Sequence, residues 1–587
     1  MGDNILMQMD KNIVIVGGGL AGLGAALKAV QKGCSVDIIS LVPVKRSHSV
    51  CAQGGINAAK NIKGEGDHPD KHFFDTIYGG DFLANQGPIK RMCDQAPEII
   101  DLYDRFGVMF NRTPEGHLDF RRFGGTLFHR TAFAGATTGQ QLLYALDEQV
   151  RRFESEGKVK KYEGWEMLSS VIDDEGNCRG VVAQNLLTME LRSFKANAVI
   201  LATGGPGNVY GKSTNSAINN GIAASSAYKQ GVHYANGEFI QVHPTAIPGT
   251  DKDRLMSESA RGEGGRVWTY KDGKPWYFLE EKYPRYGNLV PRDVATREIF
   301  DVVVNKKLAV NGKRFVYLDL THIDREELDR KLGGILEIYE KFKGADPREV
   351  PMEVFPSVHY SMGGLWVDNE KQMTNIPGLF AAGECEYQYH GANRLGANSL
   401  LSCTYGGFLA GISATDYINN IEKSVSDVKE EEFKKQIKVE ETEINEIIAQ
   451  TGNENIRQIH IDMGDLMTEN VTVVRENKKL EATIKQLTEL QGKLSSAKLP
   501  DSGKWANQSL FYAREVRHML DIAKIITTGA LARDESRGAH YKPEFPDRDD
   551  DKWLKTTLAT YQDGEPVLSY QEVDISIAKP VKRDYTK

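Results

Sequence analysis

The sequence predicts an α/β protein built on a parallel β-sheet, with further segments inserted into the sheet domain and following it. A short apolar segment, residues 11–16, runs directly into Gly17-Gly18-Gly19-Leu20-Ala21-Gly22 and then into an alanine-rich stretch. This order of strand, GxGxxG turn and helix is that of a Rossmann-like dinucleotide-binding unit. Two later apolar segments, 198–205 and 376–384, also end in small residues, as parallel strands do where their carboxyl ends face a ligand.

The first strand, turn and helix favour a dinucleotide ligand. Glycines at positions 17, 19 and 22 allow a tight turn, close approach of the backbone to a pyrophosphate and close packing of the helix. The helix, which we expect to end at Gly33, would present its N-terminal N–H groups to the phosphates. The second strand, residues 34–40, ends at Ser40, where NAD-binding proteins usually have an acidic residue. A serine hydroxyl can bind a ribose, but the main support for NAD is missing.

The segment Arg46 to Ile56, which reads RSHSVCAQGGI, carries the most specific motif. A histidine in such a loop has a simple alternative explanation, a loop tip whose imidazole bonds to backbone and whose glycines permit positive φ. Together with the glycine turn, however, the segment resembles the flavoprotein subunit of succinate dehydrogenase and quinol:fumarate reductase, the complex II family. The resemblance extends from near residue 11 to residues 548–557, which is nearly the whole chain.

The resemblance implies FAD as the cofactor, joined covalently through its 8α-methyl group to His48. Glu384 follows the strand at 376–384, where its carboxylate could accept hydrogen bonds from a ribose; the alternative is an exposed loop acid. The residues expected to contact FAD are Gly17, Gly18, Gly19, Leu20, Ala21, Gly22, Ser40, Ser47, His48, Ser49, Gln53, Gly54, Gly55, Thr203, Gly204, Gly205, Glu384, Asn398, Ser399 and Leu400.

Composition limits the other possibilities. With 587 residues the chain is too long for one core, and two to four domains are expected. The net charge is -8 with no basic block, so we expect no nucleic-acid partner. Six cysteines are scattered without a CxxC pair, which predicts reduced thiols, no metal site and no iron-sulfur cluster held by this chain alone. No signal segment and no run long enough to cross a bilayer occur, so another chain would hold this one at a membrane.

The chain is expected to divide into five segments. These are residues 1–243 and 356–424 as the two parts of the FAD-binding domain, 244–355 as an inserted α+β capping domain, 425–535 as a helical bundle domain and 536–587 as a small C-terminal domain. The resemblance identifies the insertion as a lid that closes over the substrate.

Within these segments the patterns predict individual elements. Helices are expected over 75–107, 138–154, 425–450, 455–491 and 505–531. A β-meander is expected over 161–196 with its turn at 173–177, and a hairpin at 271–275. The arginine-rich segment 119–125 is interpreted as a basic surface loop, with support of the flavin site as the alternative. The C-terminal tail has few core-forming residues, and the resemblance places it against the protein surface and a partner subunit.

Interconversion of succinate and fumarate requires groups that hold two carboxylates and a group that exchanges a proton. The resemblance assigns the carboxylates to His243, Ser257, His359 and Arg394. Arg394 suits this role because its planar guanidinium can bind a carboxylate bidentately. A single histidine among thirteen is more often structural, but all of these motifs match the family together.

The resemblance assigns proton exchange to Arg292, with Glu258 and Arg261 as its relay. Arginine is ordinarily a permanent cation, so the alternative for Arg292 is a salt bridge. Pro291 is predicted to begin a helix that runs to Asn305, and a helix dipole disfavours a cation in the first turn. Residues 258 and 261 could share a helical face, although an ordinary surface ion pair has the same spacing.

Two positions depart from the family pattern. Ala260 stands where many members have a cysteine before the relay arginine, so no reactive active-site thiol is expected there. Ile222 stands where the family has an aspartate that contacts the FAD ribose, which removes one expected cofactor contact.

We therefore expect the catalytic subunit of a membrane-bound succinate:quinone oxidoreductase, at the cytoplasmic face of a bacterial membrane. Its partners would be an iron-sulfur subunit and, indirectly, a cytochrome b-type membrane anchor. The alternatives are quinol:fumarate reductase running the reverse reaction, L-aspartate oxidase or a soluble fumarate reductase, and a non-enzymatic flavin-bearing assembly subunit. The two soluble enzyme classes lack the covalent histidine, so the motif around His48 argues against them.

Overall fold

A five-stranded parallel sheet lies at the centre of the sheet domain in the computed structural model, which describes residues 11–310 and 312–586. The strand order is β19 (Leu379–Ala381), β10 (Ala198–Leu201), β1 (Asn12–Val16), β2 (Ser35–Ser40) and β6 (Val159–Glu163). Alternate residues of β1 enter two different hydrophobic cores: Val14 belongs to one, and Ile13 and Ile15 belong to the other. The sheet is therefore covered on both faces, as a parallel sheet requires.

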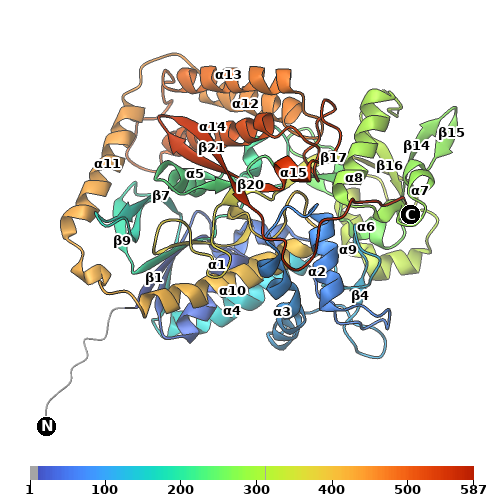
Figure 1. The fold of residues 1–587 in the computed structure, drawn as a ribbon, viewed down its shortest axis with the longest axis horizontal. Coiled ribbons are helices and arrows are strands. Elements are labelled where there is room, and N and C mark those ends of the chain that lie inside the picture. Colours follow the sequence, from blue (N-terminus) through green and yellow to red (C-terminus); the bar gives the residue numbers. More distant parts are fainter. Residues whose placement is uncertain (1–10, 311, 587) are drawn as a thin grey trace, which may run out of the picture.

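Helices α1 (Leu20–Gln31), α3 (Gln86–Arg105), α4 (Thr138–Ser155) and α10 (Asn398–Ile418) cover one face (Figure 1). Helices α1 and α10 approach closely, because a Cβ added at Gly407 would lie 2.3 Å from the carbonyl oxygen of Ala21. The same holds one turn later, at Gly411 against Ala25. This close contact places the start of α10 beside the glycine turn that precedes α1.

The helix predicted over 75–107 is two helices, α2 (Pro69–Gly79) and α3. Asp81 and Phe82, which lie between the two helices, have φ of 54° and 59°, and no α-helix can include such residues. The chain therefore turns between α2 and α3. The predicted β-meander over 161–196 is shorter in the structure, because its first strand, β6, joins the parallel sheet instead. Only β7 (Trp165–Ile172), β8 (Cys178–Asn185) and β9 (Leu191–Lys195) form the antiparallel sheet, with the predicted turn at 173–177.

The inserted region contains a six-stranded sheet in the order β13 (Arg254–Leu255), β12 (Ile240–Ile247), β17 (Met352–Ser361), β16 (Val316–Asp319), β14 (Arg266–Lys271) and β15 (Lys274–Trp276). The hairpin predicted at 271–275 joins β14 to β15. Helices α6 (Ser259–Gly262), α7 (Phe278–Lys282), α8 (Arg292–Phe300) and α9 (Arg325–Lys343) accompany this sheet. Strands β12 and β17 cross residues 244 and 355, so the region and the sheet domain share continuous strands. A π-helical segment extends α8 to Asn305, as the predicted helix does.

The C-terminal part begins with helices α11 (Glu430–Ile448), α12 (Ile456–Asn470), α13 (Asn477–Leu494) and α14 (Gln508–Ala532). The single helix predicted over 455–491 breaks at 471–476, where the sequence VTVVRE contains three β-branched valines. Helix α15 (Asp550–Trp553) and the hairpin β20 (Lys555–Gln562) and β21 (Glu565–Glu572) follow. This hairpin extends a small sheet with β11 (Tyr234–Ala235) and β18 (Gly364–Leu365), so residues after 535 contribute to the body of the protein.

Four shorter elements complete the neighbourhood of the site: β3 (Ile56–Asn57), β4 (Phe120–Arg121) and β5 (Thr131–Ala132) form one sheet, and α5 (Ile222–Lys229) packs near β7. Among the residues that the structure describes, none of the helices is both long and apolar enough to span a bilayer.

Candidate active site

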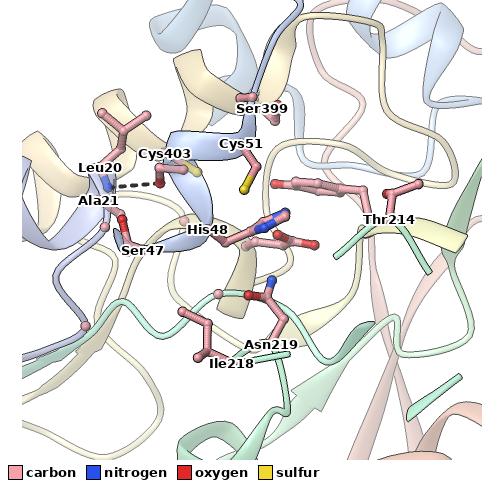
Figure 2. A pocket seen from close by; sticks show the side chains of 18 of the residues that line it. Leu20, Ala21, Ser47, His48, Cys51, Thr214, Ile218, Asn219, Ser399 and Cys403 are labelled. Atoms are coloured by element: carbon pink, nitrogen blue, oxygen red, sulfur yellow. Dashed lines mark hydrogen bonds between the residues drawn. The ribbon is translucent and has the colours of Figure 1, made fainter. Parts of the chain in front are cut away.

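A cavity of about 460 Å³ lies where the carboxyl ends of β1, β2, β10 and β19 meet the inserted region (Figure 2). Most of the predicted site residues line it. The predicted cofactor residues in its wall are Gly17, Gly18, Gly19, Leu20, Ala21, Ser40, Ser47, His48, Ser49, Gln53, Gly54, Gly55, Thr203, Gly204, Glu384, Ser399 and Leu400, and the predicted substrate and catalytic residues are His243, Ser257, Glu258, Arg292, His359 and Arg394.

Four predicted residues are absent from the wall. Gly22 packs α1 against the turn, since an added Cβ would lie 1.9 Å from the carbonyl oxygen of Gly17. Gly205 lies against the Glu384 side chain, and Arg261 lies behind Glu258. Asn398 accepts hydrogen bonds from Asn57 at 2.7 Å and His72 at 2.9 Å, so its side chain belongs to an interior network.

The glycine turn brings backbone close to the cavity. Gly17 has φ of 112°, and a Cβ there would lie 2.1 Å from the carbonyl oxygen of Ala202 on the neighbouring strand end. The adjacent serines continue the wall, with the Leu20 N–H donating to Ser49 Oγ at 3.2 Å. The turn and the N-terminus of α1 thus form one surface that suits a pyrophosphate.

Several buried polar atoms of this wall have no hydrogen-bond partner among the described residues: Ser47 Oγ, Gln53 Oε1, Thr203 Oγ1 and Asn219 Nδ2. Buried polar atoms in folded proteins are almost always paired, so unpaired atoms lining a cavity indicate groups supplied by a ligand. Donors and acceptors distributed along an elongated wall fit a dinucleotide with phosphate, hydroxyl and ring carbonyl groups. The residues present therefore fit FAD.

His48 begins a short 3₁₀ segment, His48–Cys51, and projects into the cavity near Cys51, Thr214 and Asn219 (Figure 2). The Ser216 N–H donates to His48 Nδ1 at 3.2 Å, which leaves Nε2 as the ring nitrogen available to a ligand. Burial, together with the charge of Lys252, lowers the pKa of His48 to about 4. The imidazole is therefore neutral at physiological pH.

Ser40 is the last residue of β2 and Glu384 follows β19, and both residues line the cavity. The Ser40 hydroxyl donates to the carbonyl oxygen of Val42 at 2.6 Å, so its oxygen remains an acceptor. Glu384 accepts the Ser361 N–H at 3.0 Å. Burial raises the pKa of Glu384 to about 7, against the opposing effects of the Ser361 N–H and Arg394. Glu384 is buried, which excludes the exposed loop acid.

The interpretation of 119–125 as a basic surface loop is wrong. Arg121 is buried and donates from Nε to the carbonyl oxygen of Gly54 at 3.1 Å, and Phe123 is a buried part of the cavity wall. A Cβ at Gly124 would lie 2.3 Å from Glu258 Oε1. This segment supports the predicted cofactor loop and packs against the Glu258 carboxylate, because Arg121 donates to backbone carbonyl oxygens and is not exposed to solvent.

Arg292, Glu258 and Arg261 form a buried chain. Arg292 Nε and Nη2 donate to Glu258 Oε2 at 3.0 and 2.7 Å, and Arg261 Nη2 donates to Glu258 Oε1 at 2.6 Å. Burial raises the pKa of Glu258, but Arg292 and Arg261 more than offset it, so the net shift is downward. Arg261 Nη1 donates to the carbonyl oxygen of Asn288 at 2.7 Å, which extends the chain of hydrogen bonds. The alternative of an exposed surface ion pair is excluded, because all three side chains are buried.

His243, His359 and Arg394 face the same end of the cavity. The two imidazole rings have centroids 5.1 Å apart, and Arg394 lies 4.4 Å from the Tyr360 ring centroid. Burial is the main cause that lowers the pKa of both histidines well below 6.5, with Arg292 adding to it. His243 Nε2 and Arg394 Nε are buried without a partner in the described chain. These atoms can donate to an incoming anion.

The remaining predicted substrate residue, Ser257, shares a hydrogen bond with Ser259 through their hydroxyls at 2.9 Å. The two departures from the family pattern are both buried: Ala260 in α6 and Ile222 at the start of α5, where the Ile222 N–H donates to Asn220 Oδ1 at 3.1 Å. An apolar side chain thus occupies the cavity wall at position 222.

Three further side chains belong to the site but were not predicted. Thr214 Oγ1 lies 2.7 Å from His359 Nδ1, Asn219 lines the cofactor wall, and Gln241 Oε1 accepts from Arg292 Nη1 at 2.9 Å. Gln241 could have been found, because residues 241 and 243 share a face of one strand. Thr214 and Asn219 lie in a loop with no recognisable pattern. No group of His, Cys, Asp or Glu within 11–310 and 312–586 has the arrangement of a metal site.

The glycine turn, the parallel strand ends and the elongated wall define an FAD-binding protein of the Rossmann-like class. The FAD binding domain family matches residues 12–400, and the fumarate reductase flavoprotein C-terminal family matches residues 460–585. The succinate dehydrogenase flavoprotein subunit of Bacillus subtilis (strain 168) is 64% identical over 578 residues, which is 98% of each chain. The chain therefore belongs to the family of flavoprotein subunits of succinate dehydrogenase and fumarate reductase.

Other relatives agree. The fumarate reductase flavoprotein subunit of Escherichia coli (strain K12) is 35% identical over 596 residues, covering 99% of this chain and 96% of that protein. A solved chain of E. coli quinol fumarate reductase superposes with a TM-score of 0.91 at 34% identity, covering 97% of this chain and 98% of that one. The α/β fold with an FAD-binding domain and a C-terminal helical domain is thus confirmed.

Proposed function

We propose that this chain is the catalytic flavoprotein subunit of a succinate:quinone oxidoreductase, which oxidises succinate to fumarate. One observation carries the proposal: the wall that fits FAD and the cluster of His243, His359, Arg292 and Arg394 belong to one continuous cavity. A dicarboxylate bound to this cluster would lie within the same enclosed space as the cofactor.

The substrate carboxylates are held by groups that stay positive or act as neutral donors. Arg394 presents a planar guanidinium, which binds a carboxylate through two parallel hydrogen bonds. His243 and His359 are neutral, and His243 donates from the unpaired Nε2. FAD, when bound, supplies the hydride acceptor.

Arg292, once its own proton has left through Glu258 and Arg261, takes as a neutral guanidine the proton from the carbon next to the one that loses hydride. It lies at the first position of α8, after Pro291, where the helix dipole disfavours a cation. Because the C–H proton is very weakly acidic, a strong base suits the step. The proton then passes through Glu258, which accepts from Arg292, to Arg261 and the loop at Asn288.

FAD is held by the turn at Gly17, the serines at 47 and 49, Thr203 and Glu384, and is joined covalently through His48. The covalent bond is supported by the position of the His48 ring in the cavity and by its free Nε2. The inserted region acts as a capping domain, because it contributes Glu258 and Arg292 to one side of a cavity whose other side belongs to the parallel sheet.

Electrons leave the cofactor through other chains. The sequence provides no cluster of cysteine ligands, so an iron-sulfur subunit would receive them, and a cytochrome b-type anchor would pass them to quinone. Through these partners the protein would lie at the cytoplasmic face of the bacterial membrane. Relatives named fumarate reductase support the reverse, quinol-driven reaction as the alternative, since the same residues catalyse both directions.

Anaerobic flavin spectra test the proposal. We expect succinate to bleach the flavin absorption of the purified chain and fumarate to restore it. Butyrate, which has one carboxylate, is the matched control and should leave the spectrum unchanged. A flavin that dithionite reduces but succinate does not would exclude catalysis and favour a non-enzymatic flavin-bearing subunit.

A further inference from the structure

Residues 573–586, the C-terminal strap, run from the β20–β21 hairpin across the sheet domain to the inserted region (Figure 1). Their path is fixed by side chains from earlier parts of the chain. Gln86 Oε1 accepts the N–H groups of Ile577 and Ala578 at 3.0 and 2.7 Å, and Arg548 Nη1 donates to the carbonyl oxygen of Val581 at 3.0 Å. The strap therefore belongs to the folded body.

Near its end the strap bridges two parts of the protein through Arg583. Arg583 Nη2 donates to Asp293 Oδ2 at 2.7 Å, in helix α8 of the inserted region. Its Nε lies 3.2 Å from Asp81 Oδ2, and its Nη1 donates to the carbonyl oxygen of Gly79 at 3.2 Å, both at the C-terminal end of α2 in the sheet domain. The guanidinium thus uses all three nitrogens, and one residue ties the two parts together.

Tyr585 makes a second bridge two residues later. Its buried ring packs edge-on against Tyr78 of α2 at 5.4 Å and against Tyr286 of the inserted region at 5.1 Å between ring centroids. Tyr78 in turn accepts the Asp584 N–H at 2.6 Å. The strap end is therefore held between the two parts by both charge and apolar packing.

From Arg583 an unbroken chain of buried hydrogen bonds leads to the proposed base. Asn393 Nδ2 donates to Asp293 Oδ1 at 3.0 Å, Gln241 Nε2 donates to Asn393 Oδ1 at 2.9 Å, and Arg292 Nη1 donates to Gln241 Oε1 at 2.9 Å. Each amide has one orientation only, because Gln241 Nε2 also donates to the Arg394 carbonyl at 2.7 Å and Asn393 Nδ2 also donates to the Gly79 carbonyl at 3.2 Å. A shift of Asp293 would therefore move the acceptor that faces Arg292.

We propose that Arg583 is a positioning residue for proton transfer, and this inference rests on the proposed function. By holding Asp293 against Asp81, Arg583 fixes α8 relative to the sheet domain and, through Asn393 and Gln241, the direction of the Arg292 guanidinium. It touches neither substrate nor cofactor. Its charge also matters: Arg297 pairs with Asp293 and Arg548 pairs with Asp81, whereas Arg583 pairs with both buried carboxylates and offsets their repulsion.

The test compares Arg583→Gln with Lys582→Gln in the flavin-loaded chain, with succinate as substrate and a dye as electron acceptor. Lys582 is exposed and adjacent, so its variant removes the same charge without touching the chain of hydrogen bonds. Misplacement of a catalytic group by about 1 Å can cost about 100-fold in rate. We expect Arg583→Gln to lower kcat by about 10- to 100-fold, with KM and flavin content near those of the wild type.

A second readout separates positioning from general destabilisation. If proton transfer to Arg292 becomes the slow step, the deuterium isotope effect on kcat, measured with succinate deuterated at both methylene carbons, should rise in Arg583→Gln and stay unchanged in Lys582→Gln, because the transferred proton comes from a substrate C–H bond. If Arg583→Gln does not fold, Arg583→Lys retains the charge but replaces the three separated nitrogens that contact Asp81, Asp293 and Gly79 with one nitrogen on a shorter side chain. A lowered kcat with a raised isotope effect in this variant would support the inference equally.

Two outcomes would overturn the inference. One is an Arg583→Gln variant, or a folded Arg583→Lys variant in its place, with the kcat and isotope effect of the wild type. The other is a variant in which only KM rises. A wild-type chain that does not turn over succinate would instead refute the proposed function itself.

Discussion

Charge balance at the residue scale explains why the site suits a dicarboxylate. Arg261, Arg292 and Arg394 bring three guanidiniums to the buried site, and Glu258 supplies one carboxylate. With His243 and His359 neutral, two positive charges remain among these residues in the resting site, where Arg292 is still protonated, and a dianion would neutralise them. Burial is the main cause that lowers the pKa of Arg394 to about 9, and the proximity of Arg292 adds to it. Binding a dianion should therefore stabilise the charged arginines.

Arg292→Gln should separate the base from the binding groups. Loss of an acid or base commonly costs about 10²- to 10⁴-fold, and the weak acidity of the C–H bond favours the upper part of this range. We expect turnover to fall by that amount, while dicarboxylate binding, measured as a dissociation constant from the flavin spectrum, weakens much less.

Arg394→Gln is the matched comparison. It removes a carboxylate anchor, so binding and turnover should fall together. Near-normal turnover with only a raised KM in Arg292→Gln would make residue 292 a binding group, and the base would then have to be Glu258 or one of the histidines.

His48→Ser should abolish the covalent attachment of FAD. Wild-type chain on a denaturing gel should show a flavin-fluorescent band, and the variant should show none. The variant should retain FAD noncovalently, because the turn at Gly17 and the unpaired atoms of the wall remain. We expect fumarate reduction to survive better than succinate oxidation, because loss of the bond should lower the flavin potential. Release of wild-type flavin by acid precipitation would contradict the attachment.

At the scale of elements, the sequence predicts the parallel strands and the glycine turn because their patterns are local. Continuous apolar runs mark β1 and β10, and glycine at 17 is required by its positive φ. Helix boundaries are harder to predict from the sequence. The break between α2 and α3 depends on the backbone at Asp81, whose conformation is stabilised by distant partners such as Arg548 and Arg583. No pattern near residue 81 in the sequence predicts those contacts.

The same distinction holds for the candidate site. His48, His243, Arg292, His359 and Arg394 stand in motifs that a single sequence reveals. Arg121 was assigned to the surface because arginine usually is exposed, yet here the backbone carbonyls of the cofactor loop accept its N–H groups. Such a role depends on two segments meeting in space, which a local pattern does not encode.

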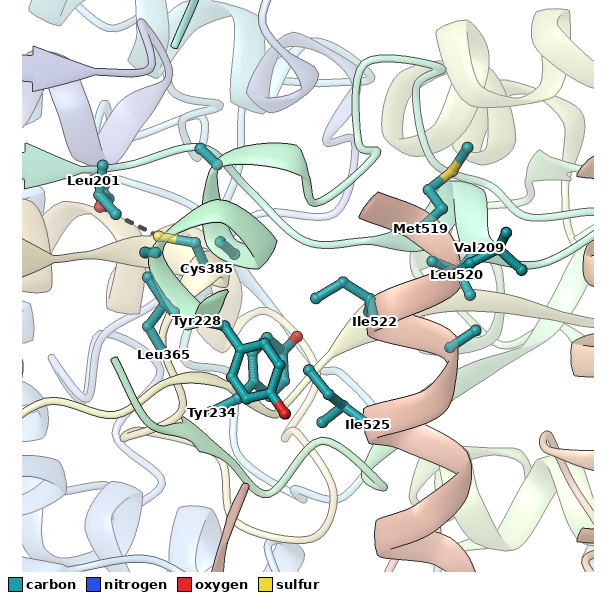
Figure 3. Close-up of a cluster of buried hydrophobic side chains, with 14 of the residues drawn as sticks. Leu201, Val209, Tyr228, Tyr234, Leu365, Cys385, Met519, Leu520, Ile522 and Ile525 are labelled. Carbon is teal, nitrogen blue, oxygen red and sulfur yellow. Dashed lines mark hydrogen bonds between the residues drawn. The ribbon is translucent and has the colours of Figure 1, made fainter. Parts of the chain in front are cut away.

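Helix α14 packs its apolar face on the sheet domain, where Met519, Leu520, Ile522 and Ile525 meet Tyr228 and other buried side chains (Figure 3). One ion pair is embedded beside this core. Arg514 of α14 donates to both the buried Glu166 of β7 and Gln184 Oε1, the latter at 2.7 Å. Glu166 also lines the proposed cofactor cavity, so this pair links the helical part to the cofactor site.

Arg514→Ala should destabilise the protein strongly, because it leaves the Glu166 carboxylate buried and unpaired. Removal of one partner of a buried pair costs about 3–5 kcal/mol. Arg457→Ala, at an exposed position of α12, is the control and should change the free energy of unfolding by less than about 0.5 kcal/mol. Denaturant unfolding of both variants measures the difference; equal midpoints would show that the pair contributes nothing.

At the scale of the whole molecule, the active site is assembled from segments far apart in the sequence. The cofactor wall comes from residues before 60, near 203 and near 384, whereas Arg292 and Glu258 come from the inserted region. The strap then contacts both parts from the opposite end of the chain. Under the proposed mechanism, proton transfer depends on how the inserted region sits on the sheet domain, so we expect residues outside the cavity to influence the rate.

The last prediction concerns the route of electrons out of the protein. The purified chain should oxidise succinate with artificial dyes but not with quinone. The proposed function assigns quinone reduction to the iron-sulfur subunit and the membrane anchor. The described residues contain neither a group of His, Cys, Asp or Glu arranged to hold a metal nor a helix long and apolar enough to span a bilayer. Adding an iron-sulfur subunit and a membrane anchor should restore quinone reduction, with the dye-coupled rate unchanged. Quinone reduction by the pure chain, at a rate comparable to that of the dye, would refute the three-part arrangement.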